Sequence, residues 1–200
     1  MRTIERTIYK YNELSEKAQQ TVMDWWLQGK EAEVFDTDCN ETLQYFFDEN
    51  NLDYRYSLGY SQGDGFSIYG TISLEQFFNC LKKDNLICQA FNENFSEKDK
   101  KTLLHYASIC GEIEIEKKRS YSFNKDSIDF SLQWIDTLKY YHGYRAVNID
   151  VIFTLEKTMQ CFFDNMCRNM EKMGYDFFYT FHPDDVENYE FYENGEVYIS

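Results

Sequence analysis

The chain has 200 residues, of which 43% are hydrophobic and 18% aromatic. This composition excludes an intrinsically disordered chain and is sufficient for a sizeable hydrophobic core. The 35 acidic residues outnumber the 20 basic ones and give a formal charge of −15, which disfavours direct binding to duplex DNA because the phosphates attract Lys and Arg. An acidic surface suits a basic partner, although the same charge also serves simply to keep an aromatic-rich protein soluble.

Proline usage indicates a single domain, and cysteine usage indicates free thiols. Pro183 is the only proline, and no Gly/Ser-rich linker occurs, so residues 1–200 are predicted to form a single globular domain. No CxxC pair is present, which favours buried free thiols over disulfides or a zinc site. No metal or other cofactor is expected. The cysteines are Cys39, Cys80, Cys88, Cys110, Cys161 and Cys167.

The N-terminal sequence Met1-Arg2-Thr3-Ile4-Glu5-Arg6 has no apolar signal core. The chain also lacks a run of about 18 apolar residues, the length needed to cross a bilayer. We therefore expect a soluble protein in the cytoplasm that does not associate with a membrane.

The first predicted elements are a strand and a helix. Residues 3–11 are rich in β-formers and are predicted to form the strand. Ser15 is a typical N-cap, and the helix that it starts is predicted to end at Gly29. Trp25 and Trp26 follow the apolar residues of this helix at helical spacing, which favours packing in the core over an exposed docking patch.

A helix from about Asp38 to Asn50 is predicted next, with Leu43, Phe46 and Phe47 facing inward. A hairpin follows, because residues 54–60 and 66–72 alternate as strands do around a glycine-rich corner, Ser61-Gln62-Gly63-Asp64-Gly65. Glycine tolerates positive φ, and Asp bonds to its own backbone two residues on, so this corner is predicted to be a tight β-turn.

The second half of the chain follows the same pattern of helices and hairpins. Residues 74–83 and 97–110 are predicted helices, joined by a looser connection over residues 85–94. Ile113 and Ile115 alternate with Glu, as do the apolar residues of 128–134, which predicts a second antiparallel hairpin around residues 124–126. Residues 136–148 have no assignment, and Val147, Ile149, Val151 and Phe153 could extend them as a strand.

A long helix is predicted from about Asp150 to Met173, ended by Gly174. A short turn at Pro183-Asp184-Asp185 and an Asn194-Gly195 turn, which could add an edge hairpin, complete the chain. The predicted fold class is α+β, with antiparallel hairpins forming a sheet and helices packed on it.

Catalytic signals are sparse. His105, His142 and His182 lie in separate segments without metal-ligand spacing, and no P-loop, GxSxG or HExxH pattern occurs. The glycine corner lacks the lysine and helix start of a phosphate loop, and Asp64 with Asp53 lacks the DxDxDG array of a calcium loop. The weakest of three hypotheses is an enzyme that uses Asp64 and His142.

Acidic clusters are the better candidates for a functional site. Carboxylates beside aromatic rings can imitate the phosphates and bases of nucleic acid and occupy a basic groove, although an acidic run is more often a solvated edge. The candidate partner-binding residues are Glu31, Glu33, Asp36 and Asp38 in the first cluster, Asp184, Asp185, Glu187, Glu190, Glu193 and Glu196 in the second, and Gln62 and Asp64 at the hairpin tip.

Three stretches of the chain resemble a known family. They are Thr3 to Ala18 with its Glu13-Leu14-Ser15-Glu16 core, the hairpin Ser57 to Ser67 with its Ser61-Gln62-Gly63-Asp64-Gly65 motif, and the ending Tyr189-Glu190-Phe191-Tyr192-Glu193-Asn194-Gly195. The family consists of small proteins of bacteriophages and prophages that are often described as antitoxin-like, and anti-CRISPR inhibitors of type II effector nucleases include similar chains. Leu58, where the family has glycine, and an insertion around residues 136–148 depart from its pattern.

The resemblance implies a mobile-element protein without an established active site, which acts in the cytoplasm of the bacterial host. The leading hypothesis is a non-enzymatic inhibitor of a nucleic-acid-handling defence protein, above all a CRISPR effector nuclease with its guide RNA, that blocks binding of target DNA. The alternative is an antitoxin-like protein that neutralises a toxin by direct binding.

Overall fold

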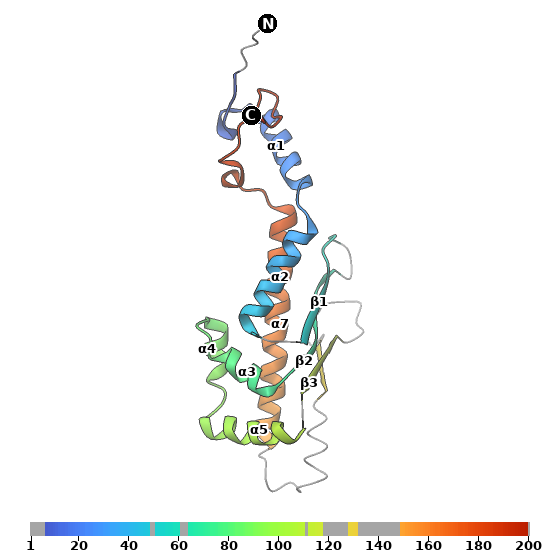
Figure 1. Cartoon of the computed structure of the whole chain (residues 1–200), viewed down its shortest axis with the longest axis vertical. Helices are drawn as coiled ribbons and strands as arrows, with labels where there is room; N and C mark the ends of the chain where they lie inside the picture. Colours follow the sequence, from blue (N-terminus) through green and yellow to red (C-terminus); the bar gives the residue numbers. More distant parts are fainter. Residues whose placement is uncertain are drawn as a thin grey trace. The chain divides into compact units, whose positions relative to one another are not determined.

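The computed structural model describes residues 7–48, 51–60, 64–110, 112–117, 128–131 and 149–199. The fold is α+β, as predicted (Figure 1). The chain divides into two compact units: unit 1 comprises residues 1–36 and 173–200, and unit 2 comprises residues 37–172. The division falls within helices α2 (Ala32–Phe46) and α7 (Ile149–Tyr179), so both helices contribute to each unit. The single domain expected for residues 1–200 stays a prediction.

Unit 1 contains the 3-10 helix η1 (Tyr11–Glu13), helix α1 (Glu16–Gln28) and the 3-10 helix η2 (Pro183–Val186), besides parts of α2 and α7. The predicted cap of α1 is confirmed, because Ser15 Oγ accepts a 3.4 Å hydrogen bond from the Ala18 N–H and Gly29 occupies the C-cap. The predicted Pro183 turn is also confirmed, with proline in the first turn of η2.

The strand predicted for residues 3–11 is wrong where the structure describes it. Tyr9 forms one isolated bridge, and the chain turns into η1 at Tyr11. The cause is local: the Glu13 carboxylate accepts a 2.7 Å hydrogen bond from the Lys10 N–H, which stabilises a helical turn over an extended strand. Residues 3–6 of this prediction lie outside the described residues.

The C-terminal tail turns at Asn194-Gly195 as predicted, but it does not join the described sheet. Phe191 forms bridges with Tyr9 and with Val197, so the tail pairs with the N-terminal segment and with itself. Tyr9 and Phe191 exchange two 2.9 Å backbone hydrogen bonds. The core of unit 1 lies beneath this pairing, and its buried members are Leu14, Ala18, Val22, Val186 and Phe191.

Unit 2 contains a four-stranded antiparallel sheet in the order β1-β2-β3-β4. The strands are β1 (Asn51–Ser57), β2 (Gly65–Ile72), β3 (Ile113–Lys117) and β4 (Ile128–Ser131). Both predicted hairpins are confirmed in their pairing, with Tyr54 opposite Ile68 and Ile115 opposite Phe130, but β1 ends at Ser57, before the end of the strand predicted over 54–60. The corner at 124–126, residues 132–134 and the unassigned segment 136–148 lie outside the described residues.

The other helices of unit 2 are α3 (Leu74–Leu81), α4 (Leu86–Asn92) and α5 (Glu97–Cys110). The helices predicted at 74–83 and 97–110 are therefore confirmed. The loose connection predicted for 85–94 is wrong, because α4 occupies most of it. This helix buries Cys88 although it is only two turns long, so tertiary packing supports it more than its own length does.

Two helix boundaries also differ from the prediction. Helix α2 begins at Ala32, before the predicted Asp38, and ends at Phe46. Helix α7 begins at Ile149, which replaces the strand suggested for Ile149, Val151 and Phe153, and it runs through Gly174 to Tyr179. A glycine inside a helix costs only about 1 kcal/mol. The apolar stripe of this long helix outweighs that cost.

The core of unit 2 is rich in phenylalanine. The Phe47 and Phe163 rings are stacked with their centroids 5.7 Å apart, and Phe162 lies edge-on to Phe77 at 5.6 Å. Phe47 comes just after α2 ends, and Phe77 lies on α3. These contacts pack α3 and the end of α2 against α7 residues 162–163.

Candidate functional site

Negative charge is concentrated in unit 1. Its residues 1–36 and 173–200 carry 14 acidic and 5 basic residues, a balance of −9. Residues 37–172 carry 21 acidic and 15 basic residues, a balance of −6 over about twice the length. The C-terminal part of unit 1 has seven acidic residues and no Lys or Arg. A basic partner is therefore attracted most strongly to unit 1.

The first acidic cluster lies at the start of α2. Glu33 is in the first turn, where the helix dipole favours a negative charge. Phe35 is fully buried against the rings of Phe177 and Phe178, with centroids 5.8 and 5.3 Å away. This contact orients the helix so that Glu31 and Glu33 are exposed, as is Asp38 further along, while Asp36 is half-buried.

The second cluster divides into structural and exposed carboxylates. Asp185 accepts a 3.2 Å hydrogen bond from the His182 N–H and so caps η2. Glu190 lies 3.9 Å from the ammonium of Lys10. The side chains of the remaining members are exposed, and in the described part of the chain they form neither a helix cap nor an ion pair. They are Asp184, Glu187, Glu193 and Glu196.

Lys10 also binds the backbone of this cluster. Its Nζ donates to the carbonyl oxygens of Glu187 and Tyr189, each at 3.3 Å. Lys10 thus supplies a cation to the acidic C-terminal segment of unit 1.

Unit 1 also exposes aromatic side chains. The Trp25 and Tyr189 side chains are 38% and 39% exposed, and their rings meet edge-on with centroids 5.4 Å apart. The prediction that both tryptophans pack in the core is therefore wrong for Trp25. Trp26 is half-buried, and its ring lies 4.9 Å from the ammonium of Lys30. Helical spacing alone does not reveal that the tail, through Tyr189, covers only part of Trp25.

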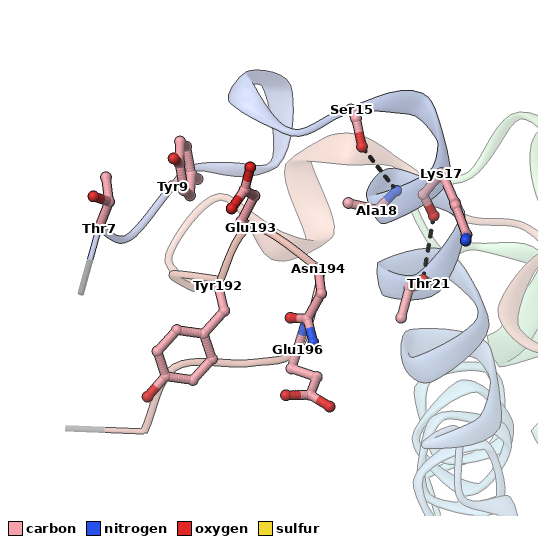
Figure 2. A pocket seen from close by; sticks show the side chains of 10 residues that line it. All are labelled: Thr7, Tyr9, Ser15, Lys17, Ala18, Thr21, Tyr192, Glu193, Asn194 and Glu196. Carbon is pink, nitrogen blue, oxygen red and sulfur yellow. Dashed lines mark hydrogen bonds between the residues drawn. The ribbon is translucent and has the colours of Figure 1, made fainter.

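A groove of about 710 Å³ opens between the N-terminal segment, α1 and the C-terminal turn (Figure 2). Its lining is more polar than apolar. Two of the sequence-predicted residues, Glu193 and Glu196, are among its lining residues. The groove is lined by Thr7, Tyr9, Ser15, Lys17, Ala18, Thr21, Tyr192, Glu193, Asn194 and Glu196.

The hairpin tip has an architectural role. Both carboxylate oxygens of Asp64 accept hydrogen bonds within the loop, from the Ser57 hydroxyl at 2.8 Å and the Gly59 N–H at 2.6 Å. Tyr60 between them has a φ of 55°, a left-handed conformation. Gln62 lies outside the described residues. Contact of either Gln62 or Asp64 with a partner stays a prediction.

The candidate catalytic and metal-binding residues are dispersed. His105 is exposed on α5, and His182 Nε2 lies 3.9 Å from an Asp176 carboxylate oxygen. The Asp53 carboxylate accepts hydrogen bonds from its neighbouring backbone and from Tyr69. His142 is outside the described residues. Among the residues that the structure describes, no three His, Cys, Asp or Glu side chains are placed to hold a metal ion.

Five cysteines are free thiols in the described structure, and Cys161 is the one among them that is partly exposed. Cys80 on α3 and Cys88 on α4 lie in contact, and burial raises the pKa of both thiols. The Cys110 side chain lies outside the described part. Within the described residues, no helix is long and apolar enough to cross a membrane.

Comparison with known proteins found no match to a family model, to a curated protein or to a solved structure. The resemblance to the phage and prophage family therefore stays a prediction.

Proposed function

We propose that this protein is a non-enzymatic inhibitor, encoded by a phage or another mobile element, that binds a basic nucleic-acid-handling defence protein of its bacterial host. The specific target that we propose is a type II RNA-guided nuclease. The protein would act in the host cytoplasm by blocking access of target DNA.

The observation that carries the proposal is the concentration of charge in unit 1. Exposed carboxylates of the segment 184–196 lie in the same unit as the exposed rings of Trp25 and Tyr189. Phosphate charges and flat bases are the two features that a nucleic-acid channel recognises in a single strand. Exposed carboxylates and aromatic rings in one unit present the same two features.

The proposed mechanism is competition. A type II nuclease binds the guide duplex, the displaced strand and the PAM through surfaces of Lys and Arg. An acidic protein that occupies one of these surfaces excludes the DNA without any chemical step. Charge attraction also speeds the encounter, most of all at low salt.

The first test measures binding to a purified type II effector loaded with guide RNA. We expect the affinity to fall by about tenfold or more when NaCl is raised from about 0.05 M to about 0.5 M, because salt screens exposed charges. Salt-independent binding, or no binding, would contradict the proposal.

Charge-neutralising variants refine this test. Glu31→Gln with Asp184→Asn removes two exposed carboxylates of the two clusters and should weaken binding. Glu41→Gln with Glu93→Gln removes two exposed carboxylates of unit 2 and serves as the matched control. Equal weakening by both pairs would mean that net charge, and not the unit-1 surface, attracts the partner.

A second test separates the inhibitor from an antitoxin. Phages are plated on host cells that express the protein, with and without CRISPR immunity, and the immobilised protein is used to recover partners for mass spectrometry. We expect higher plaque counts only where immunity is active. Recovery of a toxin, with plaque counts unchanged, would favour the antitoxin-like alternative.

A further inference from the structure

The groove between residues 7–9, α1 and the C-terminal turn is lined by two exposed carboxylates. Its volume of about 710 Å³ lies within the range of about 300–1,000 Å³ that is usual for ligand sites. We propose that it binds an arginine side chain of a basic protein segment. The inference rests on the proposed function, in that it names the group of the basic partner that unit 1 recognises.

Three polar side chains of the groove form hydrogen bonds within the chain. Ser15 Oγ accepts from the Ala18 N–H, and Thr21 Oγ1 donates to the Lys17 carbonyl (Figure 2). The Asn194 side-chain oxygen accepts from the Glu196 N–H at 3.1 Å. These bonds hold part of the lining in place, and the two lining carboxylates take no part in them.

Those carboxylates are Glu193 and Glu196. Both are exposed, and within the described part of the chain neither side chain has a hydrogen-bond or ion-pair partner. Lys17 is the one described lining residue with a positive charge. The groove therefore carries a net negative charge, which favours a cationic group and disfavours an anion.

Unit 1 already binds cations of its own in two neighbouring places. Lys30 places its ammonium 4.9 Å from the centre of the Trp26 ring and 4.7 Å from that of Phe177. Lys10 reaches the carbonyl groups of Glu187 and Tyr189, a few residues before the groove turn. Aromatic rings and backbone carbonyls of this unit thus bind ammonium groups, and the groove offers rings with two carboxylates in addition.

Arginine fits these groups better than lysine. Its planar guanidinium can donate two parallel hydrogen bonds to one carboxylate and can stack on an aromatic ring at the same time. The groove contains two carboxylates together with the rings of Tyr9 and Tyr192. A lysine ammonium is a point charge and cannot use both kinds of group equally.

The groove is already formed in the free chain. Gly195 has a φ of +88°, and a Cβ there would lie 2.4 Å from the Ala18 carbonyl oxygen, so the turn is seated directly on α1. The paired hydrogen bonds between Tyr9 and Phe191 hold the opposite wall. A preformed site loses little conformational entropy when it binds.

The test uses the full chain and three blocked tripeptides of sequence Gly-Arg-Gly, Gly-Lys-Gly and Gly-Gln-Gly. Each is titrated while the backbone amide signals of Tyr192, Asn194 and Gly195 are followed by NMR. We expect the arginine peptide to shift these signals, the lysine peptide to bind more weakly and the glutamine peptide to have no effect. Shifts located elsewhere, or equal effects of the arginine and lysine peptides, would overturn the inference.

Three variants test the role of the lining. Glu193→Gln with Glu196→Gln should weaken arginine-peptide binding by at least about fivefold, whereas the matched control Glu41→Gln with Glu93→Gln should change it by less than about twofold. Lys17→Gln should strengthen binding, because it removes the opposing charge. A gain of binding cannot result from unfolding, so the inference stays testable even if the double variant is less stable.

The outcomes distinguish this inference from the proposed function. If the groove variants bind the arginine peptide as the unaltered chain does, while the effector still binds in a salt-dependent manner, the groove assignment fails and the proposed function stands. If the arginine peptide binds as expected but no effector does, the groove stands and the proposed target is wrong.

Discussion

Asp64 closes the glycine hairpin by accepting a 2.6 Å hydrogen bond from the backbone N–H of Gly59. Its other carboxylate oxygen accepts from the Ser57 hydroxyl. The motif Ser61-Gln62-Gly63-Asp64-Gly65 thus places an acceptor where the loop needs one. This relationship accounts for the acidic residue of the motif without any ligand.

The Asp64→Ala variant should consequently lose stability. Removing this charged acceptor, whose two hydrogen bonds are exposed to solvent, costs about 0.5 to 1.5 kcal/mol of unfolding free energy. Urea denaturation measures the loss, and Asp64→Asn, which retains one side-chain oxygen, should lose less. If Asp64→Ala keeps full stability but fails to bind the partner, the side chain is a contact residue instead.

Glu171 predicts a pH dependence of stability. Burial raises the pKa of its carboxyl group, the nearby Asp64 carboxylate raises it further, and Arg168 lowers it. The pKa of Glu171 is higher in the folded state than in the unfolded state. Its contribution to folding stability is therefore fully present below the unfolded-state pKa and is lost as pH rises through the folded-state pKa. Glu171→Gln should therefore raise the melting temperature near pH 7 and have little effect near pH 3.

Thermal melts of both proteins across this pH range measure the Glu171 effect. Glu156→Gln on the same helix is exposed and provides the control. A Glu171→Gln variant that stabilises the protein equally at both pH values would contradict the assignment, because the gain would then not depend on ionisation.

We expect position 195 to require glycine. Its φ of +88° is unfavourable for other residues, and an added Cβ would meet the Ala18 carbonyl oxygen. Gly195→Ala should cost about 1 to 3 kcal/mol and should speed amide hydrogen exchange at Tyr9 and Phe191, whose pairing the turn supports.

Gly29→Ala is the matched control for this change. Gly29 has a helical φ of −82°, and its Cβ would lie 3.5 Å from the nearest atoms, an ordinary contact. This substitution should be neutral or slightly stabilising. A similar loss of unfolding free energy in both variants would contradict the close contact of the Gly195 turn with α1.

The thiols should differ in reactivity. Burial raises the pKa of Cys80 and Cys88 and excludes reagents from them, whereas Cys161 is partly exposed. Iodoacetamide at about pH 7.5 should therefore label Cys161 before Cys80 and Cys88 in the folded protein, as peptide mass spectrometry will show. All cysteines should be labelled in urea, and early labelling of Cys80 in the folded protein would contradict its burial.

Local signals in the sequence predicted much of the fold. The Ser15 cap, the Pro183 turn, the Asn194-Gly195 turn and both hairpins are each specified by a few neighbouring residues, and each is confirmed. The charge balance and the positions of the acidic clusters were likewise evident. These features depend on short-range backbone preferences or on composition, so they need no knowledge of distant contacts.

Helix ends were harder to predict. Gly174 is a typical stop signal, yet α7 continues past it, because the packing of this helix outweighs the small local cost of glycine. Helix α4 formed where the sequence indicated a loose connection, since burial of Cys88 depends on neighbours that are distant in sequence.

The sequence by itself determined the α+β fold, the strand pairing of both hairpins and a strongly acidic chain. Only the tertiary structure decided that the tail pairs with Tyr9, that Glu193 and Glu196 line a groove beside α1, and that Asp64 bonds within its own loop. The physical reason is that capping, alternation and charge act over a few residues. A binding surface arises where segments nearly the whole chain apart are brought together by burial of a shared core.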